Sequence, residues 1–177
     1  MKVTAMTLER MNGKEFEEIV RERNVEYKAR RLAHVSRCGV QSTYRDGEWM
    51  PIQSLPDFEG VTSFAHQFIF DCKVCSQASF DLSKYRKETN GPKTRQLSHM
   101  RERSSFGVVC FFLMHWHARQ GKTFSQPEVT YLFPICNDLE YWQAFDRAEK
   151  KMITRADCES VGVEIRWNCY GDGRKPR

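Results

Sequence analysis

Two carboxylates and a lysine stand out because of where they lie in the chain. Residues 68–74 read Phe-Ile-Phe-Asp-Cys-Lys-Val, and the aromatic and β-branched residues around Asp71 and Lys73 predict a buried β-strand. Side chains alternate along a strand, so Asp71 and Lys73 share one face with Ile69. A carboxylate and an ammonium are costly to bury without a partner or a task. A second carboxylate, Asp57, lies in the segment just before this strand.

These groups are the ones that metal-assisted cleavage of a phosphodiester requires. Mg²⁺ prefers oxygen ligands and usually takes one or two carboxylates together with waters and phosphate oxygens. The bound metal lowers the pKa of a water and offsets the charge that develops in the transition state. Lys73 would reach the attacking water or a non-bridging oxygen from the same strand face. An ordinary Asp–Lys pair on a half-exposed strand has the same pattern, so the motif alone leaves both interpretations open.

The N-terminal part of the chain predicts an amphipathic helix that would lie near this strand. Asn12 is a suitable N-cap, and Phe16, Ile19 and Val20 form an apolar stripe at helical spacing. Glu17 lies next to the stripe and could therefore turn toward a buried site.

The rest of the chain alternates between helix and strand patterns. Gln96 begins a second predicted helix, and apolar runs predict strands at 107–114 and 129–133. The last of these strands is expected to stop at Pro134, because proline cannot continue a strand ladder. This order of elements predicts an α/β fold, and 177 residues are enough for one domain with a proper core.

The ordered series of motifs resembles the PD-(D/E)xK nuclease superfamily, and within it the RecU-type Holliday junction resolvases of bacteria and their phages. The similarity runs from about residue 12 to residue 167, and the series is more specific than any one motif. Asp71 stands where the family usually has Glu, a conservative change because Asp also binds Mg²⁺. The matching motifs are a Gly-x-x-x-Glu helix start at Gly13 and Glu17, Asp57 before a short hairpin, Asp71-Cys72-Lys73 on a strand, and Gln96 to Met100.

The resemblance implies a restriction-endonuclease-like single domain with a central mixed β-sheet flanked by helices. It also implies that Asp57 and Asp71 hold Mg²⁺ or Mn²⁺, together with the backbone carbonyl of Cys72. Glu17 would complete the metal shell directly or through water. Lys73 would activate the water or stabilise the transition state, and Gln96 would orient the water or the scissile phosphate.

The resemblance further implies that the substrate is branched DNA, cut during recombination and repair. A homodimer would supply two equivalent sites for symmetric cuts in a junction. The family's stalk, which enters the centre of a junction, would correspond to a short hairpin at about 38–55. Two alternatives stay open: a restriction-type or phage endonuclease that acts on other DNA structures, and a catalytically inactive DNA-binding protein on the same scaffold.

Basic residues are predicted to contact DNA phosphates near these motifs. The formal net charge is +5, and a solvated basic face would produce similar clusters, but their place beside the predicted site favours phosphate contact. Residues 84–94 are expected to form a flexible basic loop, and 170–177 a basic tail. The predicted DNA-binding residues are Arg30, Arg31, Arg37, Arg45, Lys84, Lys87, Lys93, Arg95, Arg101 and Arg103.

The cysteines and two of the histidines could also bind metal, but they are expected to have structural roles. The chain has seven cysteines, and Cys72 and Cys75 have the spacing of half a zinc site, but no second pair has matching spacing. Reduced core thiols and no bound zinc are therefore expected. His115 and His117 share a strand face that can bind metal, but such pairs more often cap a strand end or lie on the surface, so no ligand role is expected.

No membrane partner is expected, because no apolar run approaches the length that spans a bilayer. The first residues lead into no apolar stretch of the kind found in a signal peptide. The sequence therefore predicts a cytoplasmic protein, in a bacterial cell or a phage-infected host.

Overall fold

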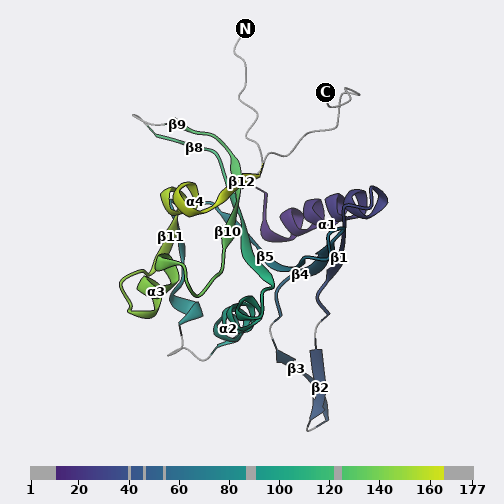
Figure 1. Ribbon diagram of the computed structural model, residues 1–177. Helices are drawn as coiled ribbons and strands as arrows, with labels where there is room; N and C mark the ends of the chain where they lie inside the picture. The colour runs from purple at the N-terminus through teal and green to yellow at the C-terminus, as the bar shows by residue number, and fades with distance from the viewer. Residues whose placement is uncertain are drawn as a thin grey trace.

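A six-stranded mixed β-sheet forms the centre of the molecule (Figure 1). The computed structural model describes residues 11–39, 41–45, 47–53, 55–86, 91–121 and 125–165. Strands β5 and β7 run parallel, and the other neighbouring strands of the sheet run antiparallel. In spatial order the strands are β1 (Ala33–Arg37), β4 (Phe58–Thr62), β5 (Gln67–Cys75), β7 (Val109–Trp116), β10 (Val129–Pro134) and β12 (Val163–Ile165).

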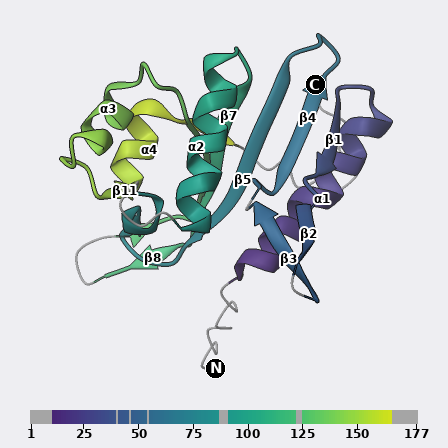
Figure 2. The same ribbon diagram turned by 90° about the horizontal axis from the view of Figure 1, so that it is seen from below.

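Helices cover both faces of this sheet (Figure 2). Helix α1 (Gly13–Ala29) buries Phe16 and Val20 on one face, and helix α2 (Pro92–Ser105) buries Leu97 and Met100 on the other. The face that holds α2 also packs against α3 (Glu140–Asp146) and α4 (Arg155–Val161). This arrangement confirms the predicted α/β class with a central mixed sheet flanked by helices.

Three small two-stranded sheets surround the central one. Strand β6 (Ser79–Asp81) pairs with β11 (Met152–Thr154), and a short 3-10 helix, η1 (Ser83–Tyr85), follows β6. The other two sheets are hairpins: β2 (Gln41–Arg45) with β3 (Glu48–Gln53), and β8 (Arg119–Gln120) with β9 (Ser125–Gln126). Among the described helices, none combines the length and apolar character needed to cross a membrane.

The first hairpin, β2–β3, lies within the segment predicted to form a short stalk. It projects away from the central sheet at the bottom of Figure 1. Gly47 occupies its turn with a φ of +88°, a conformation that glycine adopts without strain. A hairpin thus lies within the segment 38–55, and its role as a stalk stays a prediction.

Helix α2 begins earlier than the sequence motif suggested. The predicted start was Gln96, whereas the helix starts at Pro92, with Gly91 as its N-cap. Proline suits the first helical position because its missing N–H would have no helical partner there. Both ends of the predicted flexible loop at 84–94 are consequently helical, in η1 and α2, while residues 87–90 and the predicted tail at 170–177 lie outside the described residues.

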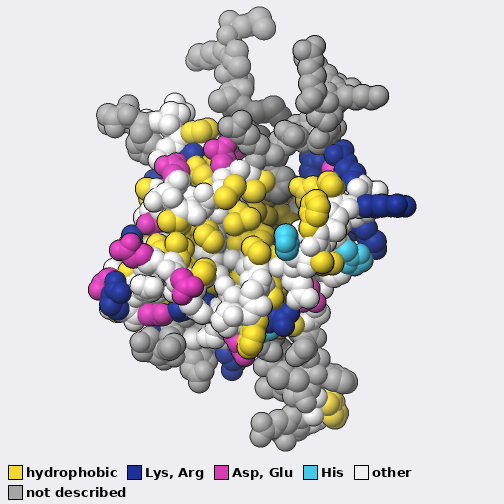
Figure 3. Space-filling model, viewed as in Figure 1, with side chains coloured by type: hydrophobic (Ala, Val, Ile, Leu, Met, Phe, Trp, Pro, Cys, Tyr) yellow, Lys and Arg dark blue, Asp and Glu magenta, His cyan; other side chains and the backbone are white. Residues whose placement is uncertain are grey.

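An apolar groove of about 310 Å³ opens beside α1. Figure 3 shows hydrophobic side chains gathered near the centre of one face of the molecule, between α4 and α1. The groove is lined by side chains of α1 and the sheet, among them Val20, Tyr27, Phe68, Leu113 and Leu132. The α1 face of the sheet is thus less completely covered than the face that holds α2, α3 and α4.

Gly60 in β4 lies where a larger residue would meet the backbone of the next strand. A Cβ there would be 2.6 Å from the His34 carbonyl oxygen and 2.7 Å from the Phe68 ring. We expect Gly60→Ala to lower the free energy of unfolding by about 1–3 kcal/mol, because a backbone carbonyl cannot move aside without disturbing the β1–β4 ladder. Urea denaturation measures this loss.

Gly13→Ala is the matched control, because a Cβ at this helix start has no neighbouring atom within 4 Å. The free energy of unfolding of Gly13→Ala should lie within about 0.5 kcal/mol of the wild-type value or slightly above it. Equal losses in the two variants would show that the close approach at Gly60 does not limit stability.

Candidate active site

Asp71 and Lys73 lie side by side on the face of β5 that is turned toward α2. Asp71 is 1% exposed and Lys73 is 9% exposed, so the interpretation as an ordinary half-exposed pair does not hold. The Asp71 Oδ2 atom contacts the Lys73 ammonium, and Asp71 Oδ1 accepts a hydrogen bond of 2.5 Å from Gln96 Nε2. Cys72, in contrast, packs with Phe70 on the opposite face, as strand alternation predicted.

Asp57 is brought to the same strand by the pairing of β4 with β5. The antiparallel register joins Phe58 to Phe70, so the next position joins Asp57 to Asp71. The Cys72 backbone N–H donates a hydrogen bond of 2.7 Å to Asp57 Oδ2, which fixes the carboxylate against β5. The predicted pair of carboxylates is therefore assembled at one point on the strand.

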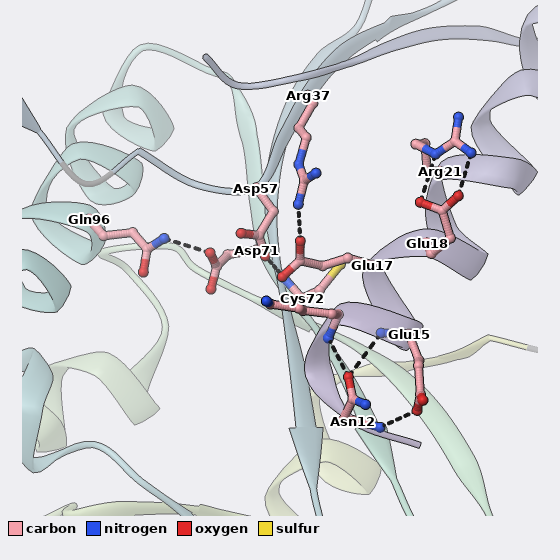
Figure 4. Close-up of polar contacts among 11 residues, drawn as sticks. Asn12, Glu15, Glu17, Glu18, Arg21, Arg37, Asp57, Asp71, Cys72 and Gln96 are labelled. Atoms are coloured by element: carbon pink, nitrogen blue, oxygen red, sulfur yellow. Dashed lines mark hydrogen bonds and ion pairs between the residues drawn. The ribbon is translucent and has the colours of Figure 1, made fainter. Parts of the chain in front are cut away.

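Glu17 approaches from the α1 side of the sheet. The helix start is fixed by a capping box, in which the Asn12 side chain accepts from the Glu15 N–H and the Glu15 carboxylate accepts from the Asn12 N–H. One turn into the helix, Glu17 forms an ion pair with Arg37 at the end of β1. Figure 4 shows Gln96, Asp71, Asp57 and Glu17 in a row that crosses β5 from the α2 side to the α1 side.

Gln96 holds Asp71 in place, and both the nitrogen and the oxygen of its side-chain amide have hydrogen-bond partners. Its Nε2 donates to Asp71 Oδ1 and, at 2.9 Å, to the backbone carbonyl of Leu55. Its Oε1 accepts from Lys93 Nζ at 3.3 Å. Because both amide hydrogens already have protein acceptors, the geometry favours a positioning role for Gln96 over the predicted contact with water or phosphate.

Burial lowers the pKa of Lys73 to about 7, and the nearby Lys93 charge acts in the same direction. The carboxylates of Asp57 and Glu17 act in the opposite direction. The site therefore holds a lysine that can exchange a proton near neutral pH, an uncommon property for this side chain.

The residues at this site fit a divalent cation with a preference for oxygen. Within the described part of the chain, the buried Asp71 Oδ2 finds no hydrogen-bond donor in suitable geometry, although it contacts Lys73. Asp57 and Glu17 add two further carboxylates. Asp57 is hydrogen-bonded to the strand that carries Asp71, and Glu17 follows Asp57 in the row of side chains in Figure 4. This donor set matches the oxygen ligands that Mg²⁺ and Mn²⁺ prefer.

Some of the predicted DNA-binding residues lie beside the site. Arg37 pairs with Glu17, and Lys93 donates to Gln96. Arg103 lines a cleft of about 430 Å³, which the segment before β4 and the residues that follow β1 also line. Lys84 and Arg95 are exposed near the start of α2. Arg37 and Lys93 therefore contact residues of the site directly, and Arg103 lies at the cleft.

Other predicted DNA-binding residues lie elsewhere. Arg101 donates hydrogen bonds to Asp146 and Asn137, so its charge is already paired. Arg30 and Arg31 are exposed at the far end of α1, roughly 20 Å along the helix from Glu17 at 1.5 Å per residue. Lys87 and the side chain of Arg45 lie outside the described residues.

Two contacts made by residues of the site could not be predicted from the sequence. Arg37 was predicted to contact phosphate, but its pairing with Glu17, 20 positions earlier, depends on the return of β1 alongside α1. The Leu55 carbonyl is a backbone group, and its bond to Gln96 spans 41 positions. Both contacts are set by tertiary structure, which local patterns do not encode.

The Cys-x-x-Cys pair does not form half of a zinc site. Cys72 and Cys75 occupy opposite faces of β5, and they pack into separate apolar clusters. All the cysteines in the described segments have free thiols, and burial raises the pKa of Cys72 and Cys75 well above the usual value. These cysteines therefore behave as protonated packing residues.

Replacing Gln96 by Leu tests its positioning role. We expect Gln96→Leu to reduce metal affinity or the rate of metal-dependent cleavage by about 10–100-fold, the usual effect of removing a group that orients a metal ligand. Metal titration followed by initial-rate measurements at saturating metal would separate the two. In the control Gln143→Leu, an exposed glutamine of α3 is replaced and both quantities should be unchanged. Full activity of Gln96→Leu at every metal concentration would contradict the role.

Comparison with known proteins points to one family. The family model described as RecU, recombination protein U, matches residues 11–171. The Holliday junction resolvase RecU of Limosilactobacillus reuteri (strain DSM 20016) is 27% identical over 115 residues, which is 64% of this chain and 48% of that protein. A second strain of the species, JCM 1112 of subspecies reuteri, gives the same figures. The chain therefore spans about half the length of the curated relatives that it matches.

A solved structure also aligns with the fold. It is that of Hjc from Archaeoglobus fulgidus, described as a Holliday junction resolvase from an archaeal hyperthermophile. The alignment has a TM-score of 0.48 and 16% sequence identity, and it covers 84% of this chain and 94% of the other.

Proposed function

The chain belongs to the RecU family, and from this membership we propose that it is a divalent-metal-dependent endonuclease that cuts four-way DNA junctions. One observation carries the proposal: Asp71 and Lys73 are buried in contact on β5, and Asp57 is hydrogen-bonded to the same strand. A buried carboxylate with an oxygen that lacks a hydrogen-bond donor among the described residues is a ready ligand for a metal. The L. reuteri relatives are named as Holliday junction resolvases.

In the proposed site, Asp57 and Asp71 hold Mg²⁺ or Mn²⁺, with the Cys72 carbonyl and Glu17 completing the shell directly or through water. When bound, the metal would lower the pKa of a water and offset negative charge on the phosphate. Gln96 keeps the Asp71 carboxylate in one orientation. Arg37 does the same for Glu17. The protein therefore supplies a preorganised set of oxygen ligands.

Lys73 is the second chemical group of the proposed reaction. As an ammonium it would stabilise the negative charge that develops on the phosphate, in a site where burial strengthens that interaction. As a neutral amine it would accept a proton from the attacking water. Its lowered pKa makes both forms accessible near neutral pH.

The surroundings of the site support a DNA substrate. Lys84 lies on η1, Lys93 and Arg95 lie at the start of α2, and Arg103 of α2 lines the cleft. These cations would contact phosphates without reading bases. The β2–β3 hairpin projects from the sheet, and Gln96 binds the carbonyl of Leu55, just beyond its end. A protruding hairpin beside a basic cleft suits branched DNA, whose strands separate at a central opening.

A homodimer is part of the proposal. Resolution of a junction requires two symmetric cuts, and a dimer with two-fold symmetry would place one site on each strand. We also propose that the protein works in the cytoplasm, where buried free thiols such as Cys75 and Cys158 stay reduced. Sedimentation in the presence and absence of DNA would test the oligomeric state.

A cleavage assay distinguishes the proposed function from its alternatives. Labelled four-way junction and linear duplex of the same sequence would be incubated with Mg²⁺, Mn²⁺ or EDTA, using wild type, Lys73→Met and the exposed control Lys151→Ala. Paired nicks in the junction alone, dependent on metal and lost only in Lys73→Met, are expected. Equal cleavage of both substrates would leave a nuclease without junction preference. Junction binding without cleavage in any metal would leave a DNA-binding protein on the nuclease scaffold.

A further inference from the structure

Two histidines and a glutamate meet at the end of β7, away from the carboxylate cluster. One ring nitrogen of His115, one ring nitrogen of His117 and one carboxylate oxygen of Glu128 all lie within 4.8 Å of one another. His115 and His117 are 3% and 6% exposed, so neither has the surface position that their sequence pattern suggested. The start of α1 covers them: the Phe16 ring lies 5.0 Å from the His115 ring, measured between centroids.

The tautomer of His117 is set by a backbone carbonyl. Its Nε2 lies 2.9 Å from the Met11 carbonyl oxygen. A carbonyl oxygen only accepts hydrogen bonds, so Nε2 must carry the hydrogen. In the neutral ring the other nitrogen, Nδ1, then presents a lone pair, which is the form of imidazole that binds metals.

The tautomer of His115 is not fixed in the same way, because its partner is a hydroxyl group, which can donate or accept a hydrogen bond. Its Nδ1 lies 3.0 Å from the Thr130 hydroxyl, across the β7–β10 pair. Its Nε2 is buried and, among the described residues, has no hydrogen-bond partner. The nearest charged group is Glu128, whose Oε1 atom lies 3.4 Å from that nitrogen.

With hydrogen on Nε2, the His115 ring faces the Glu128 carboxylate at 3.4 Å without forming a hydrogen bond of suitable geometry. With hydrogen on Nδ1, the Nε2 lone pair faces the carboxylate, and a cation between the two groups would satisfy both. A proton is one such cation, but burial lowers the pKa of His115, and His117 acts in the same direction, while Glu128 acts against both. A metal ion satisfies the nitrogen and the carboxylate together without protonation of the ring.

We propose that His115, His117 and Glu128 form a second metal site, which takes one Zn²⁺ ion. Two imidazoles and one carboxylate, with an open position for water, are a ligand set that Zn²⁺ accepts, whereas Mg²⁺ prefers oxygen alone. Tetrahedral zinc with bonds of about 2.0–2.1 Å separates its ligands by roughly 3.3 Å. The His115–Glu128 distance of 3.4 Å already fits, the other two separations are no more than 4.8 Å, and the Glu128 side chain, 55% exposed, has room to move.

The partners of the two imidazoles also suit metal binding. A histidine ligand usually donates its other ring N–H to a carbonyl, carboxylate or similar acceptor, which fixes the ring orientation. Here Met11 O and Thr130 Oγ1 take those places. The ion would therefore connect β7, the segment just before β10 and the residues that lead into α1.

The site is separate from the proposed nuclease centre. His115 lies on the α1 side of the sheet, whereas Asp71 and Lys73 lie on the side turned toward α2. The consequence for the enzyme is structural: the ion would fix the start of α1, the helix that carries Glu17.

The test is a titration of the 177-residue chain with Zn²⁺ and with Co²⁺, whose visible absorption is much stronger in a four-coordinate site than in water. To remove binding at the carboxylate cluster, the titration uses the Asp71→Asn background as well as wild type. One equivalent is expected to bind in the Asp71→Asn background, whereas wild type can bind a further equivalent at the carboxylate cluster. Glu128→Gln should weaken the binding at least tenfold, His117→Gln should weaken it further, and the exposed control His66→Gln should leave it unchanged. Because Glu128 is exposed, its variant should fold normally, as a melting curve without metal would verify.

Nuclear magnetic resonance gives a second readout that needs no variant. Zn²⁺ should shift the ring ¹⁵N signals of His115 Nε2 and His117 Nδ1 and leave those of His66 in place. The proposal is overturned if the Asp71→Asn protein binds neither ion, if Glu128→Gln and His117→Gln bind as tightly as their background, or if the His115 and His117 signals stay unchanged at saturating Zn²⁺.

Discussion

Asp71→Asn should reduce metal-dependent DNA cleavage by about a thousandfold or more. The variant should still fold, because the lowered pKa of Lys73 lets its amine lose its proton when the partner charge is removed. A bound metal contributes several kcal/mol of transition-state stabilisation, and each 1.36 kcal/mol corresponds to tenfold in rate, so a loss of about 4 kcal/mol has this size. Asn keeps the shape of the side chain and can accept from Gln96, but it removes the charge that attracts the metal. Single-turnover rates on a saturating four-way junction measure the effect.

The matched control for this variant is Asp138→Asn, because Asp138 is an exposed carboxylate in the turn before α3. Its cleavage rate should stay within twofold of wild type. In EDTA, where neither protein holds metal, junction affinity should be retained in Asp71→Asn, since the loss of one negative charge near the phosphates cannot weaken electrostatic attraction. A rate within tenfold of wild type at saturating Mg²⁺ would remove Asp71 from the metal-binding set.

The centre of the site could be predicted because its signals are local. Asp71 and Lys73 lie on one strand, and strand alternation alone places them on a common face. Asp57 follows from the short connection between β4 and β5, which brings paired strands into register. These inferences need only the alternation of side chains along a strand and the short connection between two paired strands. Both features are visible in the sequence.

The contacts that complete the site could not be predicted, because each joins segments far apart in the chain. The Glu17–Arg37 pair and the Gln96–Leu55 bond depend on how α1 and α2 dock on opposite faces of the sheet. The β6–β11 pair is a further example, since each strand has three residues and gains stability only from its distant partner. Short strands of this kind carry almost no periodic signal.

The start of α2 shows a different kind of failure. Gly91 and Pro92 were interpreted as part of a hydrophilic loop, although proline at the first helical position is also a helix-start signal. The apolar stripe of this helix begins only at Leu97, so the hydrophobic pattern placed the start too late. The first turn is instead stabilised by contacts such as that of the Thr94 hydroxyl with the Lys84 carbonyl.

Of the two expected positions for His115 and His117, the strand end and the surface, only the first holds, because burial at a strand end depends on what covers it. A local pattern of alternating residues describes which side chains share a face, and it correctly placed His115 and His117 together. Whether that face meets water or protein is decided by Met11 and Phe16, more than 95 positions earlier in the chain. Sequence periodicity holds no information on such contacts.

The second large effect is expected in stability, where removal of Lys73 leaves its partner charge buried. In the presence of EDTA, Lys73→Met should lower the free energy of unfolding by about 3–5 kcal/mol, the usual result when one member of a buried ion pair is deleted. Asp71 is 1% exposed, and in this variant only the Gln96 amide would remain to stabilise its charge. Urea denaturation at neutral pH measures the difference.

Two comparisons separate this cause from a general packing defect. In the double variant with Asp71→Asn and Lys73→Met, no buried charge remains, so stability should return to within about 1–2 kcal/mol of wild type, because replacing both partners of a buried pair is often neutral. Saturating Mg²⁺ should also recover part of the loss in Lys73→Met, since a ligand that binds only the folded state stabilises it. A packing defect would respond to neither change. If the double variant were as unstable as Lys73→Met, the buried charge could not be the cause, and the Asp71–Lys73 contact would have no measurable part in the stability of the metal-free protein.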